Sequence, residues 1–253
     1  MDRSVRVDVV IPVYNEERDL EPSVQKLRVF LQANCPYRWR IVIADNASVD
    51  RTPEIGRRLA AQWPEEVAYI RLNRKGRGRA LRKAWLESDA DVMAYMDVDL
   101  STDLSAFMPL IQPLVEGRYH VATGSRLHPQ SRITRSLKRE IISRIYNFIV
   151  WLLFPRRRFR DAQCGFKAIT RQAARELVPR VANQSWFFDT ELLLRAEQRG
   201  YAVWEVPVIW REDPDTRVKI LRTALEDLRG LWRVRRTPDP PPIYTDPEAD
   251  YPD

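Results

Sequence analysis

Short apolar segments alternate with longer amphipathic segments along most of the chain. The apolar segments have the length and the β-branched content of buried strands, and the segments between them repeat apolar residues at helical spacing. The segments expected as strands are 7–13, 40–44, 67–72, 92–96, 119–123 and 165–169, and those expected as helices are 17–33, 52–61, 79–87, 104–115, 134–154 and 190–199. Strands separated by helices indicate an α/β fold with a mainly parallel sheet flanked by helices.

Two features near the C-terminal end change this pattern. Segment 203–208 is apolar but contains Pro207, which cannot donate a hydrogen bond to a neighbouring strand, so we expect it at an edge of the sheet. From residue 237 the chain becomes rich in proline and acidic residues, a composition typical of disordered segments. We therefore expect one domain over residues 1–236, followed by a disordered tail over 237–253.

Two aspartates, Asp97 and Asp99, follow the expected strand 92–96 directly. Alternate residues of an extended chain point to the same side, so these carboxylates are placed to share one cation. Hard oxygen ligands favour Mg²⁺ or Mn²⁺, and such an ion is most useful beside a phosphate group. One alternative stays open, because aspartates at the end of a strand also commonly cap the following turn.

The first two expected strands also end in polar residues, namely Asn15 and Glu16 after the first and Asp45 and Asn46 after the second. Ligands of open α/β sheets bind beyond the carboxyl ends of the strands, so this grouping favours a nucleotide site. Turn and helix-cap roles for Asn15, Asp45 and Asn46 remain the alternative.

A basic loop with two glycines precedes the expected helix 79–87. Gly76 and Gly78 permit close approach of the backbone to a ligand, and N–H groups at the start of a helix attract anions. Lys75 and the neighbouring arginines favour a phosphate nearby. A solvated basic loop is the alternative.

The formal net charge of +7 and the pI near 9.6 indicate an anionic partner, which could be a nucleic acid, a lipid surface or a phosphorylated substrate. No RNA-binding motif and no zinc-finger spacing accompanies the charge, so we do not expect nucleic acid as a partner. Cys35 and Cys164 lie in unrelated contexts, which indicates a reducing cytosol. We expect neither a leader peptide nor a membrane-spanning segment.

The expected helix 134–154 has a wide apolar stripe, carries no charge from Ile145 to Phe154, and is followed by a basic cluster at 156–160. Apolar residues beside a basic cluster are typical of helices that lie in the membrane interface. We therefore expect this helix to dock on a membrane surface. Burial of the stripe in the protein core is the alternative.

Several motifs, in this order, make the chain resemble the family 2 glycosyltransferases, and among them the polyprenyl-phosphate sugar synthases, such as dolichol-phosphate mannose and glucose synthases. The similarity extends from about residue 7 to about residue 228 and implies a GT-A fold. The motifs that carry it are Ile11-Pro12-Val13-Tyr14-Asn15-Glu16, Asp45-Asn46-Ala47-Ser48-Val49-Asp50, Asn73-Arg74-Lys75-Gly76-Arg77-Gly78, Asp97-Val98-Asp99, Gly124-Ser125-Arg126 and Asp161-Ala162-Gln163-Cys164-Gly165-Phe166-Lys167.

The resemblance implies a site for a nucleoside-diphosphate sugar at these motifs. Its implied donor ligands are Pro12, Tyr14, Asn15, Glu16, Asp45, Asn46, Lys75 and Gly76, with Arg217 and Lys219 closing over the diphosphate. Asp99 is implied as a direct ligand of Mg²⁺ or Mn²⁺, and Asp97 as a ligand through water or a contact of the ribose. Ser101 stands where some relatives place a metal-binding glutamine, which leaves the rest of the metal shell undetermined.

On the acceptor side, the resemblance implies that Arg126 and Arg139 grip a lipid phosphate, with Arg135 and Ser143 as weaker candidates. Gln163 is implied as a contact of the sugar or the phosphate. Asp189 stands near the position of the general base in relatives that glycosylate a hydroxyl group, although a helix-cap role is the alternative.

Together these features predict inverting transfer of a hexose from UDP-glucose or GDP-mannose to a polyprenyl or dolichyl phosphate at the cytosolic face of the membrane. A phosphate acceptor is already an anion and needs no general base. Two other functions stay open, namely a glycosyltransferase for a hydroxyl acceptor with Asp189 as base, and a noncatalytic nucleotide-sugar-binding membrane adaptor. The sequence does not decide between the donors, nor between a homo-oligomer and a separate membrane-anchoring partner.

Overall fold

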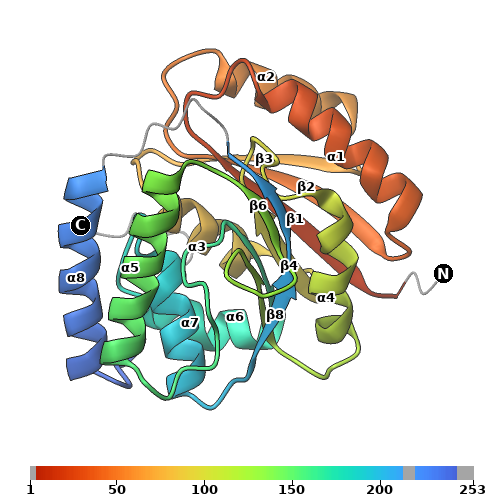
Figure 1. Ribbon diagram of the computed structural model, residues 1–253. Helices are drawn as coiled ribbons and strands as arrows, with labels where there is room; N and C mark the ends of the chain where they lie inside the picture. Colours follow the sequence, from red (N-terminus) through yellow and green to blue (C-terminus); the bar gives the residue numbers. More distant parts are fainter. Residues whose placement is uncertain (1–3, 213–219, 244–253) are drawn as a thin grey trace.

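A central sheet of seven strands runs through the computed structural model, which describes residues 4–212 and 220–243 (Figure 1). The strands lie in the order β3-β2-β1-β4-β7-β5-β8. Their bounds are β1 Arg6–Val13, β2 Arg38–Asp45, β3 Val67–Arg71, β4 Val92–Met96, β5 Val121–Ser125, β7 Phe166–Thr170 and β8 Val203–Pro207. Neighbouring strands are parallel, except that β7 is antiparallel to both β4 and β5. The expected α/β fold with a mainly parallel sheet is confirmed.

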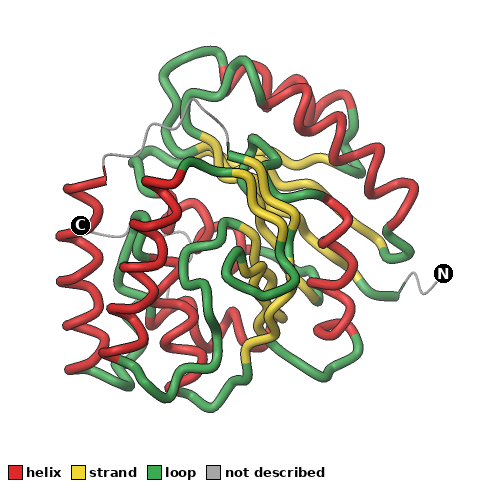
Figure 2. The backbone as a smooth tube through the Cα atoms, viewed as in Figure 1, coloured by secondary structure: helices red, strands yellow, loops and turns green. Residues whose placement is uncertain are grey.

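Helices cover both faces of the sheet, as the tube in Figure 2 shows. One face carries α1 (Leu20–Asn34), α2 (Thr52–Gln62) and α4 (Phe107–Val115, preceded by the short turn η1, Leu104–Ala106). The other face carries α3 (Arg77–Glu87), α6 (Arg171–Leu177, followed by η2, Val178–Arg180) and α7 (Phe188–Gln198). Beyond α7 lie α5 (Leu137–Leu153) and α8 (Ile220–Arg236), side by side in Figure 1.

Alternation along the strands builds two hydrophobic cores, one on each face. In β1, Val9 and Ile11 are fully buried beneath α1 and α4, whereas Val10 between them is buried on the opposite face with α3. Burial on both faces explains why the central strands are continuous apolar runs in the sequence. The acidic and polar residues that follow these strands are thereby gathered at one edge of the sheet.

The edge position expected for segment 203–208 is confirmed, because β8 is the last strand of the sheet. Other elements were not predicted. The strands β6 (Arg132–Thr134) and β9 (Ile209–Arg211) form a second small sheet, so the helix expected from residue 134 begins only at Leu137. Three-residue strands are too short to show an alternating pattern.

The first residues of the expected tail have a defined path, in contrast to the disorder that their composition suggests. Asp239 pairs with Arg199 through an Oδ1 to Nη1 distance of 2.6 Å, and the backbone N–H of Ile243 donates to the carbonyl oxygen of Pro179. Composition alone misses such contacts because their partners, Arg199 and Pro179, lie in distant parts of the sequence. Residues 244–253 lie outside the described part of the chain.

Candidate active site at the carboxyl edge of the sheet

The loops after β1 and β2 are joined by hydrogen bonds at the carboxyl edge of the sheet. The backbone N–H of Asn15 donates to Ser48 Oγ at 3.0 Å, and Asn15 Oδ1 accepts from the N–H of Val49 at 2.9 Å. The N–H of Glu16 donates to Thr52 Oγ1 at 2.8 Å. Asn15 has a positive φ of 56°, a conformation that asparagine tolerates better than most residues. Asn15 therefore shapes the loop on which Glu16 stands.

Asp45 and Asn46 also bind within the protein. The fully buried Asp45 accepts from the N–H of Ser48 at 2.8 Å and from the hydroxyl of Tyr69 at 2.5 Å. Asn46 Oδ1 accepts from the backbone N–H of Gly76, which ties this loop to the start of α3. Asp45 and Asn46 thus make contacts of the kind that the turn-forming interpretation predicts. The loops that carry these two residues form the rim of the predicted donor site.

Lys75 and Tyr14 meet across this rim. The Lys75 ammonium lies 3.5 Å from the centre of the Tyr14 ring, a cation–π contact that covers one face of this implied donor ligand. Pro12 is the last residue but one of β1 and pairs in register with Ala44 of β2. At the start of α3, the N–H of Gly76 donates to Asn46 and that of Arg79 to the carbonyl of Gln184, so these two groups do not point freely at an anion.

The acid pair lies directly beyond β4, where Asp97 is partly exposed and Asp99 is exposed. Asp99 accepts from both the N–H of Ser101, at 3.0 Å, and its hydroxyl, at 2.5 Å. Withdrawal of water by the surrounding protein raises the pKa of Asp97, and the nearby charge of Asp99 adds to this effect, while Arg77 opposes it. The charge of Asp99 thus acts on Asp97, and Asp99 also stabilises its own turn.

Gly165 makes room for the Asp97 carboxyl group. A Cβ atom on Gly165 would overlap Asp97 Oδ2 and would lie 2.7 Å from its Cγ. This contact arises because Met96 of β4 pairs with Phe166 of β7, which brings the 161–165 loop against the acid pair. The donor-side acids and the loop that contains Gln163 thus form one site.

Arg77 connects Asp97 to Asp189. Its Nη1 lies 3.0 Å from Asp189 Oδ2 and its Nη2 donates to Asp97, while its guanidinium group lies 5.1 Å from the centre of the exposed Trp186 ring. Only 12% of the Arg77 side chain is exposed. Arg77 is therefore a positioning residue between two carboxylates rather than the surface phosphate contact that its loop suggests.

Asp189 is buried within a network of three donors. Besides Arg77, it accepts from the hydroxyl of Tyr95 and pairs with Lys167, whose Nζ lies 3.2 Å from its Oδ1. The helix α7 begins at Phe188, and no cap bond from the Asp189 side chain occurs at that end among the described contacts. Asp189 is thus a buried anion that pairs with Arg77 and Lys167.

Arg126 is bound to Asp161 by a two-pronged ion pair. Its Nε and Nη2 donate to the two carboxylate oxygens at 2.7 and 3.0 Å, and its backbone N–H donates as well, at 3.0 Å. Burial alone would raise the pKa of Asp161, but the charge and hydrogen bonds of Arg126 outweigh it and lower the pKa to about 2. Arg126 lies at the site, with much of its hydrogen-bonding capacity already used.

The other predicted acceptor residues lie on and near α5. Arg139 pairs with Glu212 and has a side chain that is one-third exposed, while Arg135 pairs with Glu140. Ser143 is buried, and its hydroxyl oxygen has no partner among the described residues. Arg217 and Lys219, which we expected to close over the diphosphate, lie outside the described residues.

Gln163 has a partner that the sequence did not reveal. Its Nε2 donates to Asp227 of α8 at 3.1 Å. Asp227 is only 2% exposed. Because α8 was not predicted, no sequence signal pointed to this acid. An aspartate on the otherwise apolar inner face of a helix is the only sign that could have singled it out.

The residues present fit a divalent metal ion of the kind predicted. Mg²⁺ and Mn²⁺ commonly take one or two carboxylates and complete their shell with water and substrate phosphates. Asp97, in the space that Gly165 leaves, and the exposed Asp99 supply two such carboxylates. Within residues 4–212 and 220–243, no group of three or more acidic, histidine or cysteine residues is arranged to hold a metal by itself. Substrate oxygens would therefore complete the shell.

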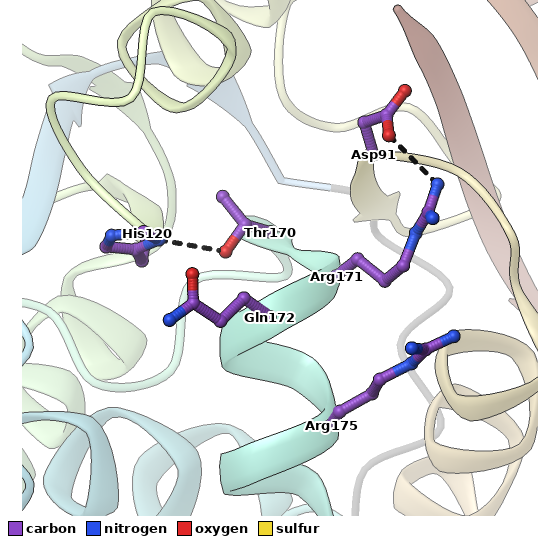
Figure 3. A pocket seen from close by; sticks show the side chains of 6 residues that line it. All are labelled: Asp91, His120, Thr170, Arg171, Gln172 and Arg175. Carbon is purple, nitrogen blue, oxygen red and sulfur yellow. Dashed lines mark hydrogen bonds and ion pairs between the residues drawn. The ribbon is translucent and has the colours of Figure 1, made fainter.

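A separate hollow of about 570 Å³ lies at the opposite edge of the sheet, where β4 and β5 begin (Figure 3). It is lined by Asp91, His120, Thr170, Arg171, Gln172 and Arg175. Its cations are already engaged in part, since Arg171 lies 2.9 Å from Asp91. None of the predicted site residues lines this hollow.

Comparisons with known proteins agree with this arrangement. Glycosyltransferase AglD of Haloferax volcanii is 39% identical over 242 residues, which are 92% of this chain but only 38% of that protein. The chain therefore spans well under half the length of that relative. A dolichyl-phosphate beta-glucosyltransferase of Drosophila melanogaster is 32% identical over 91% of this chain and 74% of its own length.

Solved structures resemble the fold. Glucosyl-3-phosphoglycerate synthase from Mycobacterium tuberculosis, solved with UDP, matches with a TM-score of 0.71 and 20% identity over 93% of this chain and 82% of its own. The same enzyme with Mn²⁺, UDP-glucose and phosphoglyceric acid matches with a TM-score of 0.66, 19% identity and coverage of 93% and 82%. The model of the family described as "Glycosyl transferase family 2" matches residues 8–178. This match and the identity with the two relatives above show that the chain belongs to glycosyl transferase family 2.

Proposed function

We propose that this protein transfers glucose from UDP-glucose to a polyprenyl phosphate, such as dolichyl phosphate, at the cytosolic face of a membrane. The observation that carries the proposal is the close packing of Asp97 against Gly165, which joins the acid pair to the loop between Asp161 and Gln163. In this proposal, the donor-side acids and the acceptor-side cations face the same space. The names of the dolichyl-phosphate glucosyltransferase relatives support glucose as the sugar.

On the donor side, the residues of the site would neutralise the pyrophosphate as it leaves. A Mg²⁺ or Mn²⁺ ion bound to Asp97 and Asp99 would supply positive charge to the leaving pyrophosphate. Asn15, Asp45 and Asn46 hold the loops that form the nucleotide rim, and Glu16 stands on one of them. Arg77 fixes the orientation of Asp97 by forming an ion pair with it.

On the acceptor side, a phosphate monoester requires orientation rather than deprotonation, because it is an anion near neutral pH. One phosphate oxygen forms a bond to the anomeric carbon as the bond from that carbon to the pyrophosphate breaks, and the electron pair leaves with UDP. Displacement from the opposite face inverts the configuration, so an α-linked donor gives a β-linked lipid phosphate. Arg126 and Arg139 are the cations proposed to orient that phosphate.

The buried network of Asp189 favours a phosphate acceptor over a hydroxyl acceptor. A general base must reach the acceptor proton, but both oxygens of Asp189 are engaged by Tyr95, Arg77 and Lys167. Substitution of Asp189 would release Arg77 from one of its two carboxylates and would lower activity with either kind of acceptor. Such a variant therefore cannot separate the two functions.

The outer faces of α5 and α8 support docking on a membrane. Large apolar side chains are exposed on both helices, namely Leu137, Ile141, Ile145, Phe148, Trp151 and Leu152 on α5 and Leu225, Leu228 and Trp232 on α8. Arginines follow at the ends of both helices, as in Arg156 and Arg236. Apolar insertion beside basic residues suits an anionic lipid surface. None of the described helices has the length and apolar character needed to cross a bilayer.

Replacing Phe148 and Trp232 together by aspartate is expected to lower binding to anionic vesicles at least about tenfold, because each change removes an apolar anchor and adds repulsion. Vesicle flotation measures the bound fraction. Val29→Asp is the matched control, since Val29 is 63% exposed on α1, on the other face of the sheet, and should bind as the wild type does. Equal loss in the control, or no loss in the double variant, would contradict membrane docking through α5 and α8.

Replacing Asp99 by asparagine is expected to lower the transfer rate about a hundredfold or more, because a neutral amide is a poor ligand for a hard cation. Initial rates over a Mn²⁺ titration measure the effect. Asp103→Asn is a close control, because Asp103 also accepts a hydrogen bond from the residue two positions on, Ser105 at 2.9 Å, and lies outside the proposed site. A similar loss in both variants would show that the turn, not the metal, explains Asp99.

A donor screen tests the proposed function. The protein is incubated with Mn²⁺, vesicles containing polyprenyl phosphate, and UDP-glucose, GDP-mannose or other nucleotide sugars in turn, and lipid products are identified by mass spectrometry. The proposal predicts a hexosyl polyprenyl phosphate from UDP-glucose. A product only from GDP-mannose would overturn the choice of donor, and the absence of any glycolipid with every donor would overturn the function.

A further inference from the structure

A buried carboxyl group on α8 contacts Gln163, one of the predicted site residues. Asp227 Oδ2 accepts from Gln163 Nε2 at 3.1 Å, while Asp227 Oδ1 has no hydrogen-bond partner among the described residues. Only 2% of Asp227 is exposed. A buried carboxyl group that uses only part of its hydrogen-bonding capacity is costly to keep, so it is usually retained for a purpose.

Three helices meet around this carboxyl group. Tyr146 of α5 forms a hydrogen bond with Thr190 of α7 at 2.8 Å. Burial raises the pKa of Tyr146, and the charge of Asp227 adds to the effect. Helix α8, which carries Asp227, packs against both α5 and α7. Asp227 therefore stands where α5, α7 and α8 join behind the loop of Gln163.

The inner and outer faces of α8 have different roles. Asp227 points inward with Leu231 and Val234, which are fully buried, whereas Leu228 and Trp232 are 43% and 51% exposed on the outer face. If α8 shifted when it docked on a lipid surface, Asp227 would move with the helix. Gln163, in turn, lies two residues before Gly165, which packs against Asp97.

We propose that Asp227 is a positioning residue, which orients the Gln163 amide toward the acceptor and links the seating of α8 to the geometry of the active site. The proposal rests on the proposed function. Asp227 does not touch the substrates in this account and acts only through Gln163. A lipid surface that holds α8 in place would also hold Gln163 in place.

The protonation of Asp227 affects this link. Burial raises the pKa of Asp227 to about 7, and the charge of the neighbouring Glu226 adds to it. The groups that face it are Gln163, Tyr146 and Glu226, and no cation of the described residues is among the causes of its shift. Between about pH 4 and pH 7 the folded protein holds this proton more tightly than the unfolded chain, so stability falls as pH rises through that range.

A double-mutant cycle separates positioning from general support of the fold. Asp227→Ala and Gln163→Ala are each expected to lower kcat/KM for polyprenyl phosphate about tenfold, with KM for UDP-glucose little changed. If Asp227 acts through Gln163, the double variant loses no more than the more damaged single variant. Independent losses that multiply to about a hundredfold would overturn the proposal. Gln112→Ala, which breaks a glutamine–carboxylate hydrogen bond of 2.9 Å to Glu116 outside the proposed site, serves as the control and should retain wild-type kcat/KM.

Asp227→Asn tests whether an amide at this position restores the activity lost in Asp227→Ala. Its amide oxygen can still accept from Gln163 Nε2, so this variant should recover most of the activity lost in Asp227→Ala, and its melting temperature should fall less between pH 4 and pH 7 than that of the wild type. An Asp227→Asn variant as inactive as Asp227→Ala, or one with the same pH dependence as the wild type, would contradict the proposal.

A measurement without turnover keeps this test distinct from that of the proposed function. In the ¹⁵N-labelled protein, the side-chain amide signal of Gln163 is identified by its loss in Gln163→Ala. The signal should titrate with a midpoint near pH 7 in the wild type and should not do so in Asp227→Asn. The same titration in both proteins would overturn the link between Asp227 and Gln163. A wild type that shows the titration but makes no glycolipid would contradict the proposed function alone.

Discussion

Replacing Gly165 by alanine is expected to lower transfer activity about a hundredfold while leaving the fold intact. The added methyl group would overlap Asp97 Oδ2 and lie 3.0 Å from Oδ1, so the Asp97 carboxyl group must turn away from its present position. The loss of a correctly placed charged group at a glycosyl-transferring site costs rate rather than global stability. Initial rates, together with thermal unfolding of the same preparation, measure both effects.

Gly117→Ala is the control for this experiment. Gly117 has a positive φ of 72° and nothing within 4 Å of an added Cβ, so alanine there strains the backbone without touching the active site. We expect Gly117→Ala to lose stability and keep its activity, the reverse of Gly165→Ala. Near wild-type activity in Gly165→Ala would show that the position of Asp97 is not critical.

Replacing Arg126 by alanine is expected to destabilise the protein by about 3–5 kcal/mol, because it leaves Asp161 buried without its counter-ion. Asp161 is fully buried, and both of its oxygens accept from Arg126. The free energy of unfolding, measured in urea, tests this value. Arg139→Ala, which breaks the more exposed pair with Glu212, should cost no more than about 1 kcal/mol.

A second variant isolates the cause. Adding Asp161→Asn to Arg126→Ala removes the unpaired charge and should restore part of the lost stability. In the wild type the lowered pKa of Asp161 implies that the contribution of this pair is fully present above about pH 4 and is lost as pH falls toward about pH 2. A stable Arg126→Ala variant with raised KM for polyprenyl phosphate would instead show that Arg126 serves the acceptor alone.

The sheet could be predicted from the sequence because burial on both faces makes its strands continuous apolar runs. The reversed direction of β7 could not, since its segment looks like the parallel strands in composition and only its pairing with β4 and β5 sets its direction. We did not predict helix α8, because the many arginines in its sequence obscure the helical spacing of its apolar residues. Leu231 and Val234 are among the residues that form its buried inner face. That face is evident only beside α7.

The sequence singles out candidate residues of the site, but it did not predict many of the partners that the structure gives them. The acid pair stood out because two carboxylates end an apolar strand. The arginine expected to meet phosphate, Arg77, instead joins Asp97 to Asp189, residues that are far apart in the sequence. Arg126 pairs with Asp161, and Gln163 pairs with Asp227. Both pairs join segments that are distant in the sequence, so no local sequence pattern predicts them.

We propose that this site transfers a sugar to a lipid phosphate. The most direct measurement offers radiolabelled UDP-glucose and Mn²⁺ to vesicles that contain either polyprenyl phosphate or the free polyprenol of the same length. We predict label in the lipid phase with polyprenyl phosphate and none above background with polyprenol. Equal labelling of both lipids, or labelling of polyprenol alone, would contradict it.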